Sequence, residues 1–166
     1  MATHSRDRWL RLADVVLLKQ CREERYRASG PGGQRRNKVE TAVRLRHPQS
    51  GVVVQAEESR SLEENRRRAL RRLRERIAME VRAPLDLDQP SLPEELLAQR
   101  RDSGALAINR KNQSYAIVTA VALDALAAAD GSYARAARAL GVTTSQLMRF
   151  LRSDREVWRA AEGLRR

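Results

Sequence analysis

The hydrophobic pattern of the first half of the chain predicts a small antiparallel sheet. Residues 42–47 alternate between apolar and basic side chains, a pattern typical of a half-buried strand. The turn composition of 48–51 and the three valines at 52–54 predict a partner strand, and residues 21–28 are expected to form the strand before them. His47 ends the alternating segment, and we expect it to be packed or hydrogen-bonded there rather than to act as a catalytic base.

Two helices are predicted to cover this sheet. Apolar residues between Asp7 and Lys19 recur at helical spacing. Ser61 and Glu64 have the spacing of a helix-capping box, and apolar residues then recur at helical spacing as far as Val81. Because arginines fill the opposite face of this second helix, a packed basic helix should lie across the sheet.

The second half of the chain has a helical pattern throughout. A short helix is predicted from Ser91 to about Arg101, and a long one from Ser114 to a stop before Gly131. Prolines and aspartates break the composition before these helices, so we expect a linker there. The expected fold is α+β, with residues 1–83 as a sheet-containing domain, 84–93 as the linker and 94–166 as an all-α helical module.

Residues 132–152 resemble a helix-turn-helix unit of the DNA-binding type. Small or apolar residues at 137, 140, 142, 147 and 150 surround a turn at Gly141 with the spacing that such a unit needs. Any tight αα-hairpin needs the same spacing, so the sequence leaves both interpretations open. If the second helix is a reader, its exposed polar residues are Thr144, Ser145, Gln146 and Arg149, with Arg135 and Arg138 as phosphate contacts. Trp158 is expected to pack the terminal helix rather than to stack on a base.

The net charge of the chain indicates which class of molecule it binds. The 166 residues carry a formal net charge of +12 and a pI of about 11.2, which favours a polyanion such as nucleic acid. Only Lys19, Lys38 and Lys111 are lysines, so nearly all of the positive charge is guanidinium, which suits bidentate phosphate contacts. A GC-rich genome would give the same preference for arginine without any function behind it.

The remaining composition excludes several classes of site. The single cysteine, Cys21, cannot form a disulfide within the chain. His4 and His47 are the only histidines, so the chain has few residues from which a metal cluster or a catalytic triad could be built. We therefore expect no metal and no cofactor. Charged residues interrupt the N-terminal segment and no stretch is long and apolar enough to span a bilayer, so we expect a cytoplasmic protein with no membrane partner.

The segment Ser29-Gly30-Pro31-Gly32-Gly33-Gln34 carries most of the chemical information. Three glycines and a proline predict a tight, projecting turn, and the missing Cβ atoms let another surface approach closely. Gln34 at the tip offers a backbone N–H and a side-chain amide, but no titratable group.

This segment and its flanks resemble the catalytic domain of class I peptide chain release factors, known by its Gly-Gly-Gln (GGQ) motif. That family carries R-x-S-G-P/A-G-G-Q-x-x-N-K followed by V-x-L-x-H-x-x-T/S-G, and residues 27–51, RASGPGGQRRNKVETAVRLRHPQSG, match both motifs. The resemblance continues through residues 58–61 and Asn65 into the basic helix. Three positions depart from the family pattern: Arg35 and Arg36 stand where histidine and valine are frequent, and Leu62 replaces a glutamine.

The resemblance implies hydrolysis of the ester that joins a nascent peptide to P-site tRNA, in the peptidyl transferase centre of large-subunit rRNA. Gly32, Gly33 and Gln34 would be the catalytic residues. The Gln34 N–H would stabilise the oxyanion, an interaction worth roughly 10²–10³ in rate, and the side chain would restrict the nucleophile to water. No general base from this protein is required, and Gln34 is commonly methylated in the family. Loop support is assigned to Arg27, Ser29, Gly30, Pro31, Asn37 and Lys38, and RNA contacts to Arg35, Arg36, Arg66, Arg67, Arg71 and Arg74.

Only a short segment precedes Arg27, where full-length release factors carry further domains, one of which reads stop codons. The chain is therefore similar to the short, codon-independent members that rescue stalled ribosomes. Those members usually end in a flexible basic tail, whereas this chain has the helical module. Either this module senses the stalled ribosome, or an accessory rescue protein delivers the chain. The alternative is a non-catalytic RNA- or DNA-binding regulator that uses the helix-turn-helix-like module and keeps the GGQ domain as a ribosome anchor.

Overall fold

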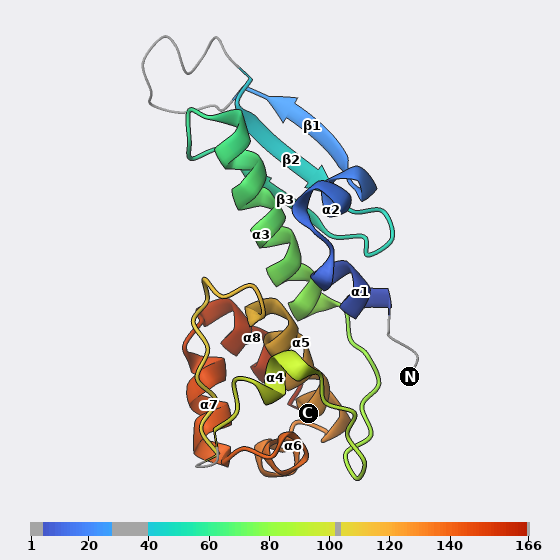
Figure 1. Ribbon diagram of the computed structural model, residues 1–166, viewed down its shortest axis with the longest axis vertical. Helices are drawn as coiled ribbons and strands as arrows, with labels where there is room; N and C mark the ends of the chain where they lie inside the picture. The colour runs from blue at the N-terminus through green and yellow to red at the C-terminus, as the bar shows by residue number, and fades with distance from the viewer. Residues whose placement is uncertain (1–4, 28–39, 102–103, 166) are drawn as a thin grey trace. The chain divides into compact units, whose positions relative to one another are not determined.

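The computed structural model describes residues 5–27, 40–101 and 104–165, and these form two compact units (Figure 1). The first unit runs to Ile77 and the second begins at Ala78. Residues 78–83 group with the second unit because Asp124 accepts hydrogen bonds from the Arg82 guanidinium and from the backbone N–H of Ala83, both at 3.0 Å. The α+β class expected from the sequence is confirmed, whereas the proposed linker over 84–93 stays a prediction.

The sheet of the first unit is a three-stranded antiparallel meander. Its strands are β1 (Arg22–Tyr26), β2 (Ala42–Arg46) and β3 (Val53–Ala56), with β2 in the centre. In β2 the predicted alternation is confirmed, because Val43 and Leu45 are fully buried while the two arginines between and after them are exposed. The register places Tyr26 opposite Ala42, so the chain leaves β1 and enters β2 at the same end of the hairpin.

The expected helix over Asp7–Lys19 is two helices, α1 (Ser5–Arg11) and α2 (Asp14–Gln20). The backbone is extended at Ala13, so the prediction of one continuous helix is wrong. A distant side chain accounts for the break, because the Arg74 guanidinium donates to the Leu12 carbonyl at 2.6 Å and pairs with Asp14 at 2.7 Å. Val16, which the single helix would have turned inward, is 44% exposed.

The basic helix is α3 (Leu62–Glu80), which packs on the sheet as expected (Figure 1). Ala69, Leu70, Leu73 and Ile77 form its buried stripe. Burial of such a stripe, rather than intrinsic propensity, supplies most of the stability of a helix in a globular domain. Val81, predicted to extend the stripe, lies beyond the end of the helix.

The second unit contains five helices in its described residues. They are α4 (Glu94–Leu97), α5 (Tyr115–Ala128), α6 (Tyr133–Leu140), α7 (Thr144–Arg152) and α8 (Arg155–Gly163). The expectation that α5 has one inward face is wrong, since every residue from Tyr115 to Leu126 is buried. Helices α4, α6 and α8 all contact α5, and a helix that is mostly apolar on every side belongs inside such a shell. The short helix α4 ends before the predicted Arg101, whose N–H instead bonds the carbonyl of Ala105.

None of the helices in these described parts of the chain combines the length and the hydropathy that crossing a bilayer demands.

His47 is a packed residue of the first unit, as predicted. Its side chain is fully buried, its Nδ1 lies 2.8 Å from the Ser50 hydroxyl, and the Trp9 ring meets it edge-on at 4.9 Å between centroids. Burial lowers the pKa of the imidazole below its ordinary value, because the charged form loses hydration.

This lowered pKa predicts a stability that depends on pH near neutrality. The unfolded chain binds the proton more readily than the folded one, so the free energy of unfolding should fall as pH drops below about 6.5, the ordinary histidine value. Urea unfolding at pH 7.5 and 5.5 would measure the fall, with the His47→Gln variant as the control, since it keeps His4. The loss between the two pH values should be smaller in the variant, and equal losses would contradict the assignment.

Candidate functional site

The glycine-rich segment connects β1 to β2. Residues 28–39 lie outside the described residues, so the positions of Ser29, Gly30, Pro31, Gly32, Gly33, Gln34, Arg35, Arg36, Asn37 and Lys38 are not described. The structure does describe both ends of the connection. Arg27 and Glu40 approach to 3.8 Å, but both side chains are more than half exposed, so this ion pair contributes little.

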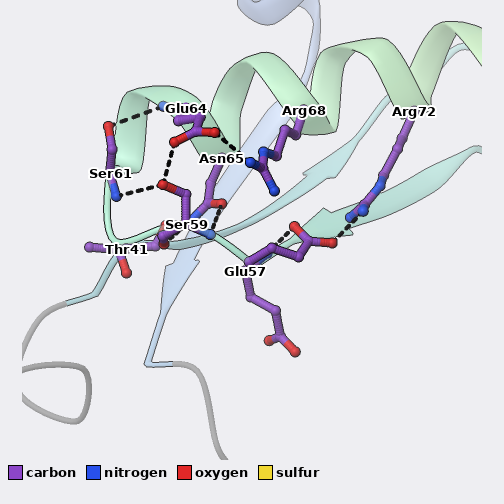
Figure 2. Close-up of polar contacts among 9 residues, drawn as sticks. Thr41, Glu57, Ser59, Ser61, Glu64, Asn65, Arg68 and Arg72 are labelled. Carbon is purple, nitrogen blue, oxygen red and sulfur yellow. Dashed lines mark hydrogen bonds and ion pairs between the residues drawn. The ribbon is translucent and has the colours of Figure 1, made fainter. Parts of the chain in front are cut away.

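A buried asparagine on α3 holds the end of the connection that enters β2. The Asn65 amide nitrogen donates to the Thr41 carbonyl at 2.7 Å and to the Ser59 carbonyl at 2.8 Å, while its oxygen accepts from the Ser59 N–H at 3.0 Å (Figure 2). The side chain has no exposed surface. One amide therefore ties three segments together: the loop exit, the β3–α3 connection and the first turn of α3. We call Asn65, Thr41 and Ser59 the loop clamp.

The start of α3 is capped through the same serine. The Glu64 N–H donates to the Ser61 hydroxyl at 3.3 Å, which is one half of the predicted capping box. The second half is indirect: the Ser61 N–H donates to the Ser59 hydroxyl at 3.1 Å, and this hydroxyl donates to the Glu64 carboxylate at 2.5 Å (Figure 2). The hydrogen bond from Ser59, and then that from Arg68, lower the pKa of Glu64. The carboxylate thus stays ionised where it stabilises the helix N-terminus.

Two further contacts tie the strands to the β3–α3 connection. Arg72 pairs with Glu58 and donates to the Gln55 carbonyl at 2.6 Å. The Tyr26 hydroxyl, at the end of β1 from which the loop leaves, donates to Glu57 at 3.1 Å. Both ends of the loop are therefore linked to the segment that precedes α3.

Of the four α3 arginines assigned to RNA, the structure gives two an intramolecular partner. The Arg66 guanidinium donates to both carboxylate oxygens of Glu23, at 2.9 and 2.8 Å, and this hydrogen bonding is the main cause of the lowered pKa of Glu23. Arg74 is held at the α1–α2 break, so neither side chain lies on a free outer face. Arg67 and Arg71 are exposed and make no hydrogen bond or ion pair with any described residue. RNA binding by α3 stays a prediction.

The arginines proposed for the second unit all lie on exposed helix positions. Arg135 approaches the exposed Asp130 to 3.6 Å, whereas Arg138 and Arg149 form no ion pair within the described residues. Trp158 stacks on Tyr133 with centroids 6.0 Å apart, and the Arg152 guanidinium lies 4.7 Å from its centroid, so it packs the terminal helix as predicted.

Asn65 stood in the matched motif, but no role was predicted for it from the sequence. The sequence did hold a signal, because the buried positions of α3 are apolar except for this amide at the start of the stripe and Glu75. A buried amide must find partners, so its place on an apolar face indicates a specific tertiary contact. Its partners, which are backbone groups 24 and 6 residues away, could not be identified without the fold.

The chain was compared with family models, with curated proteins and with solved structures. The model of the RF-1 domain matches residues 15–119. Peptide chain release factor 1 of Chloroherpeton thalassium is 52% identical over 65 residues, which are 39% of this chain and 18% of that protein. The mitochondrial translation release factor in rescue of Danio rerio is 48% identical over 63 residues, 38% of this chain and 40% of that protein.

Peptide chain release factor 2 of Nitratiruptor is 44% identical over 63 residues, and the match covers 17% of its length. The matched region thus spans less than half of each of these three relatives. No solved structure matches the chain. The RF-1 domain model covers more than half of the chain and includes the hairpin, the loop clamp and α3. The chain therefore belongs to the RF-1 domain family, the family of the catalytic domain of peptide chain release factors.

Proposed function

We propose that this protein hydrolyses peptidyl-tRNA on the ribosome and does so without reading a codon. The observation that carries the proposal is the stem of the loop: the segment with Gly32, Gly33 and Gln34 joins two paired strands, and Asn65 binds its exit. A fixed stem suits a loop that must be presented as a unit to a second macromolecule. Family membership supplies the reaction class.

The titratable groups described near the stem support a reaction without a protein base. Burial, and then the hydrogen bond to Glu57, raise the pKa of Tyr26. The pKa of Glu64 is lowered, and so is that of Glu58, where the hydrogen bond from Arg72 and other contacts outweigh the effect of burial. All three shifts point away from neutrality, so none of these groups is tuned for proton transfer at pH 7. The Gln34 N–H would stabilise the oxyanion, and ribosomal RNA and tRNA would complete the site.

The proposal that no codon is read is supported by the mitochondrial translation release factor in rescue of Danio rerio. Its name describes a release factor in rescue, and it matches this chain over a larger share of its own length than the bacterial release factors do. In this proposal the P-site peptidyl-tRNA is the substrate, the large ribosomal subunit is the partner, and Asn37 and Lys38 support the loop.

Release of labelled peptide from two kinds of ribosome complex tests the proposal. One complex is stalled at the end of a truncated message with no A-site codon, and the other is paused at a stop codon inside a longer message. We expect release on the truncated message without help from the stop codon. Release at the stop codon alone would contradict codon independence. Tight ribosome binding without release on either message would instead favour the non-catalytic regulator.

A further inference from the structure

The arginines on α6 and α7 have fewer ion-pair partners than most arginines on α3 do. Ion pairs within the first unit hold the arginines at 25, 44, 66, 68, 72 and 74. In the second unit, α6 and α7 contain no acidic residue at all. Arg138 and Arg149 are exposed on these helices and have no ion-pair partner among the described residues. Arg135 reaches only Asp130, at 3.6 Å, and the Asp130 side chain is 86% exposed.

The helix dipole opposes the position of Arg135 but favours Arg138, Arg149 and Arg152, which lie in the last turns of their helices. Arg135 lies in the first turn of α6, where the helix dipole disfavours a cation, and Arg138 follows three residues later on the same face. Arg149 and Arg152 repeat this like-charge spacing on α7. The dipole favours cations only in the last turns, so it does not explain Arg135. An anionic partner would relieve the repulsion between these like charges on adjacent helical turns.

The turn between α6 and α7 fixes how the two helices present this charge. Gly141 adopts φ of 65°, and the Val142 N–H donates to the Ala137 carbonyl at 3.0 Å, closing α6 in the manner of a Schellman cap. Gly104 accepts from the Thr143 N–H at 3.2 Å, and Arg100 donates to the Leu140 carbonyl at 3.3 Å. A segment distant in sequence thus binds both sides of the turn and stabilises the arrangement of the two helices.

The exposed side of the pair carries donors of the kind that phosphate accepts. Thr144 and Ser145 in the first turn of α7 are exposed, and Arg149 lies one turn further along from Ser145. The opposite side of α7 is buried through Leu147, Phe150 and Leu151. Hydroxyl and guanidinium donors beside one another are typical of contacts to a nucleic-acid backbone. This surface lies outside the residues that match the RF-1 domain.

We propose that the α6–α7 surface, formed by Arg135, Arg138, Thr144, Ser145 and Arg149, binds the phosphate backbone of an RNA duplex. The choice of RNA rests on the proposed function, because a ribosome offers helical RNA at high density. The major groove of an A-form helix is too narrow for an α-helix to read, so the contacts are to phosphates and ribose hydroxyls and do not depend on sequence. The surface supplies affinity and orientation for the whole protein.

Fluorescence anisotropy with the full chain and a labelled 16-base-pair RNA duplex tests this proposal. The test variant is Arg138→Gln with Arg149→Gln, and the control is Arg155→Gln with Arg159→Gln. The control removes the same charge from exposed positions of α8, and neither of these arginines has an ion-pair partner among the described residues. We expect the test variant to bind about tenfold or more weakly, with the slope of log affinity against log salt reduced by about two. The control should stay within about twofold of the parent.

Equal weakening by both variants would overturn the proposal, because binding would then reflect net charge alone. Tighter binding of a DNA duplex of the same sequence, lost in the test variant, would overturn the choice of RNA. Thermal unfolding of both variants should match the parent, since all four side chains are exposed. The measurement uses no ribosome, so inactivity in peptide release would leave the duplex result intact, and the two proposals can fail separately.

Discussion

Replacing Gln34 with proline is expected to lower the rate of peptide release about 10²–10³-fold, the usual effect of removing one oxyanion donor. Proline has no backbone N–H, so the substitution deletes the oxyanion donor that we propose. Single-turnover release from saturated ribosome complexes measures the effect, and ribosome affinity should change little because the basic surfaces remain. The matched control is Gln49→Ala, an exposed glutamine in the turn that joins β2 to β3, away from the loop.

The Gln34→Ala variant separates the two roles that we propose for this residue, oxyanion stabilisation and selection of water. It keeps the backbone N–H but loses the side chain, so release should fall less than in the proline variant. Selection of water should weaken, so that added hydroxylamine captures a larger share of the peptide than it does with the parent protein. Full release by the proline variant would show that the Gln34 N–H takes no part in the reaction.

The second large effect is expected at the loop clamp, from Asn65→Ala. The substitution leaves the Thr41 and Ser59 carbonyls and the Ser59 N–H without their partner at a part-buried site. Each unpaired buried group costs about 1–3 kcal/mol, and water entering the space left by the amide recovers part of this. We therefore expect the free energy of unfolding to fall by roughly 2–5 kcal/mol in urea denaturation. Asn112→Ala is the matched control, because Asn112 is exposed and accepts only a local hydrogen bond from Ser114.

Release by the Asn65 variant shows whether the clamp also positions the loop. At a temperature where circular dichroism finds the variant folded, we expect a lower maximal rate with a nearly unchanged half-saturating concentration. A purely structural residue would lose activity only in step with the folded fraction. Full maximal activity of the folded variant would restrict Asn65 to a role in stability.

Local patterns in the sequence predicted those elements that local interactions determine. The alternation through Val43 and Leu45 located β2, and the spacing of Ser61 and Glu64 located the start of α3. The predictions failed where a contact distant in sequence decides the structure. Arg74 separates α1 from α2 across 62 residues of chain, and Glu23 binds Arg66 across 43.

The candidate site likewise has one part that the sequence predicted and one part that only the fold reveals. The residues of the glycine-rich loop were identified from their motif, but they lie outside the described residues, so their assigned roles stay predictions. The loop clamp required the fold, because its bonds run from a side chain to backbone groups that no sequence motif specifies. In the second unit, spacing identified which apolar residues surround α6 and α7, whereas the all-round burial of α5 depends on three helices that meet it from different parts of the chain.

The contact between Arg72 and Gln55 has a consequence for solubility. β3 is an edge strand, because β2 alone pairs with it among the residues that the structure describes, and Val53 on this strand is 48% exposed. Edge strands can recruit strands from other molecules and so begin aggregation. Arg72 occupies a main-chain oxygen of β3 and, anchored by Glu58, places a guanidinium beside the edge. An incoming strand would have to displace this charge. The ion pair between Arg72 and Glu58, which ties α3 to the β3–α3 connection, therefore also opposes intermolecular β-sheet formation.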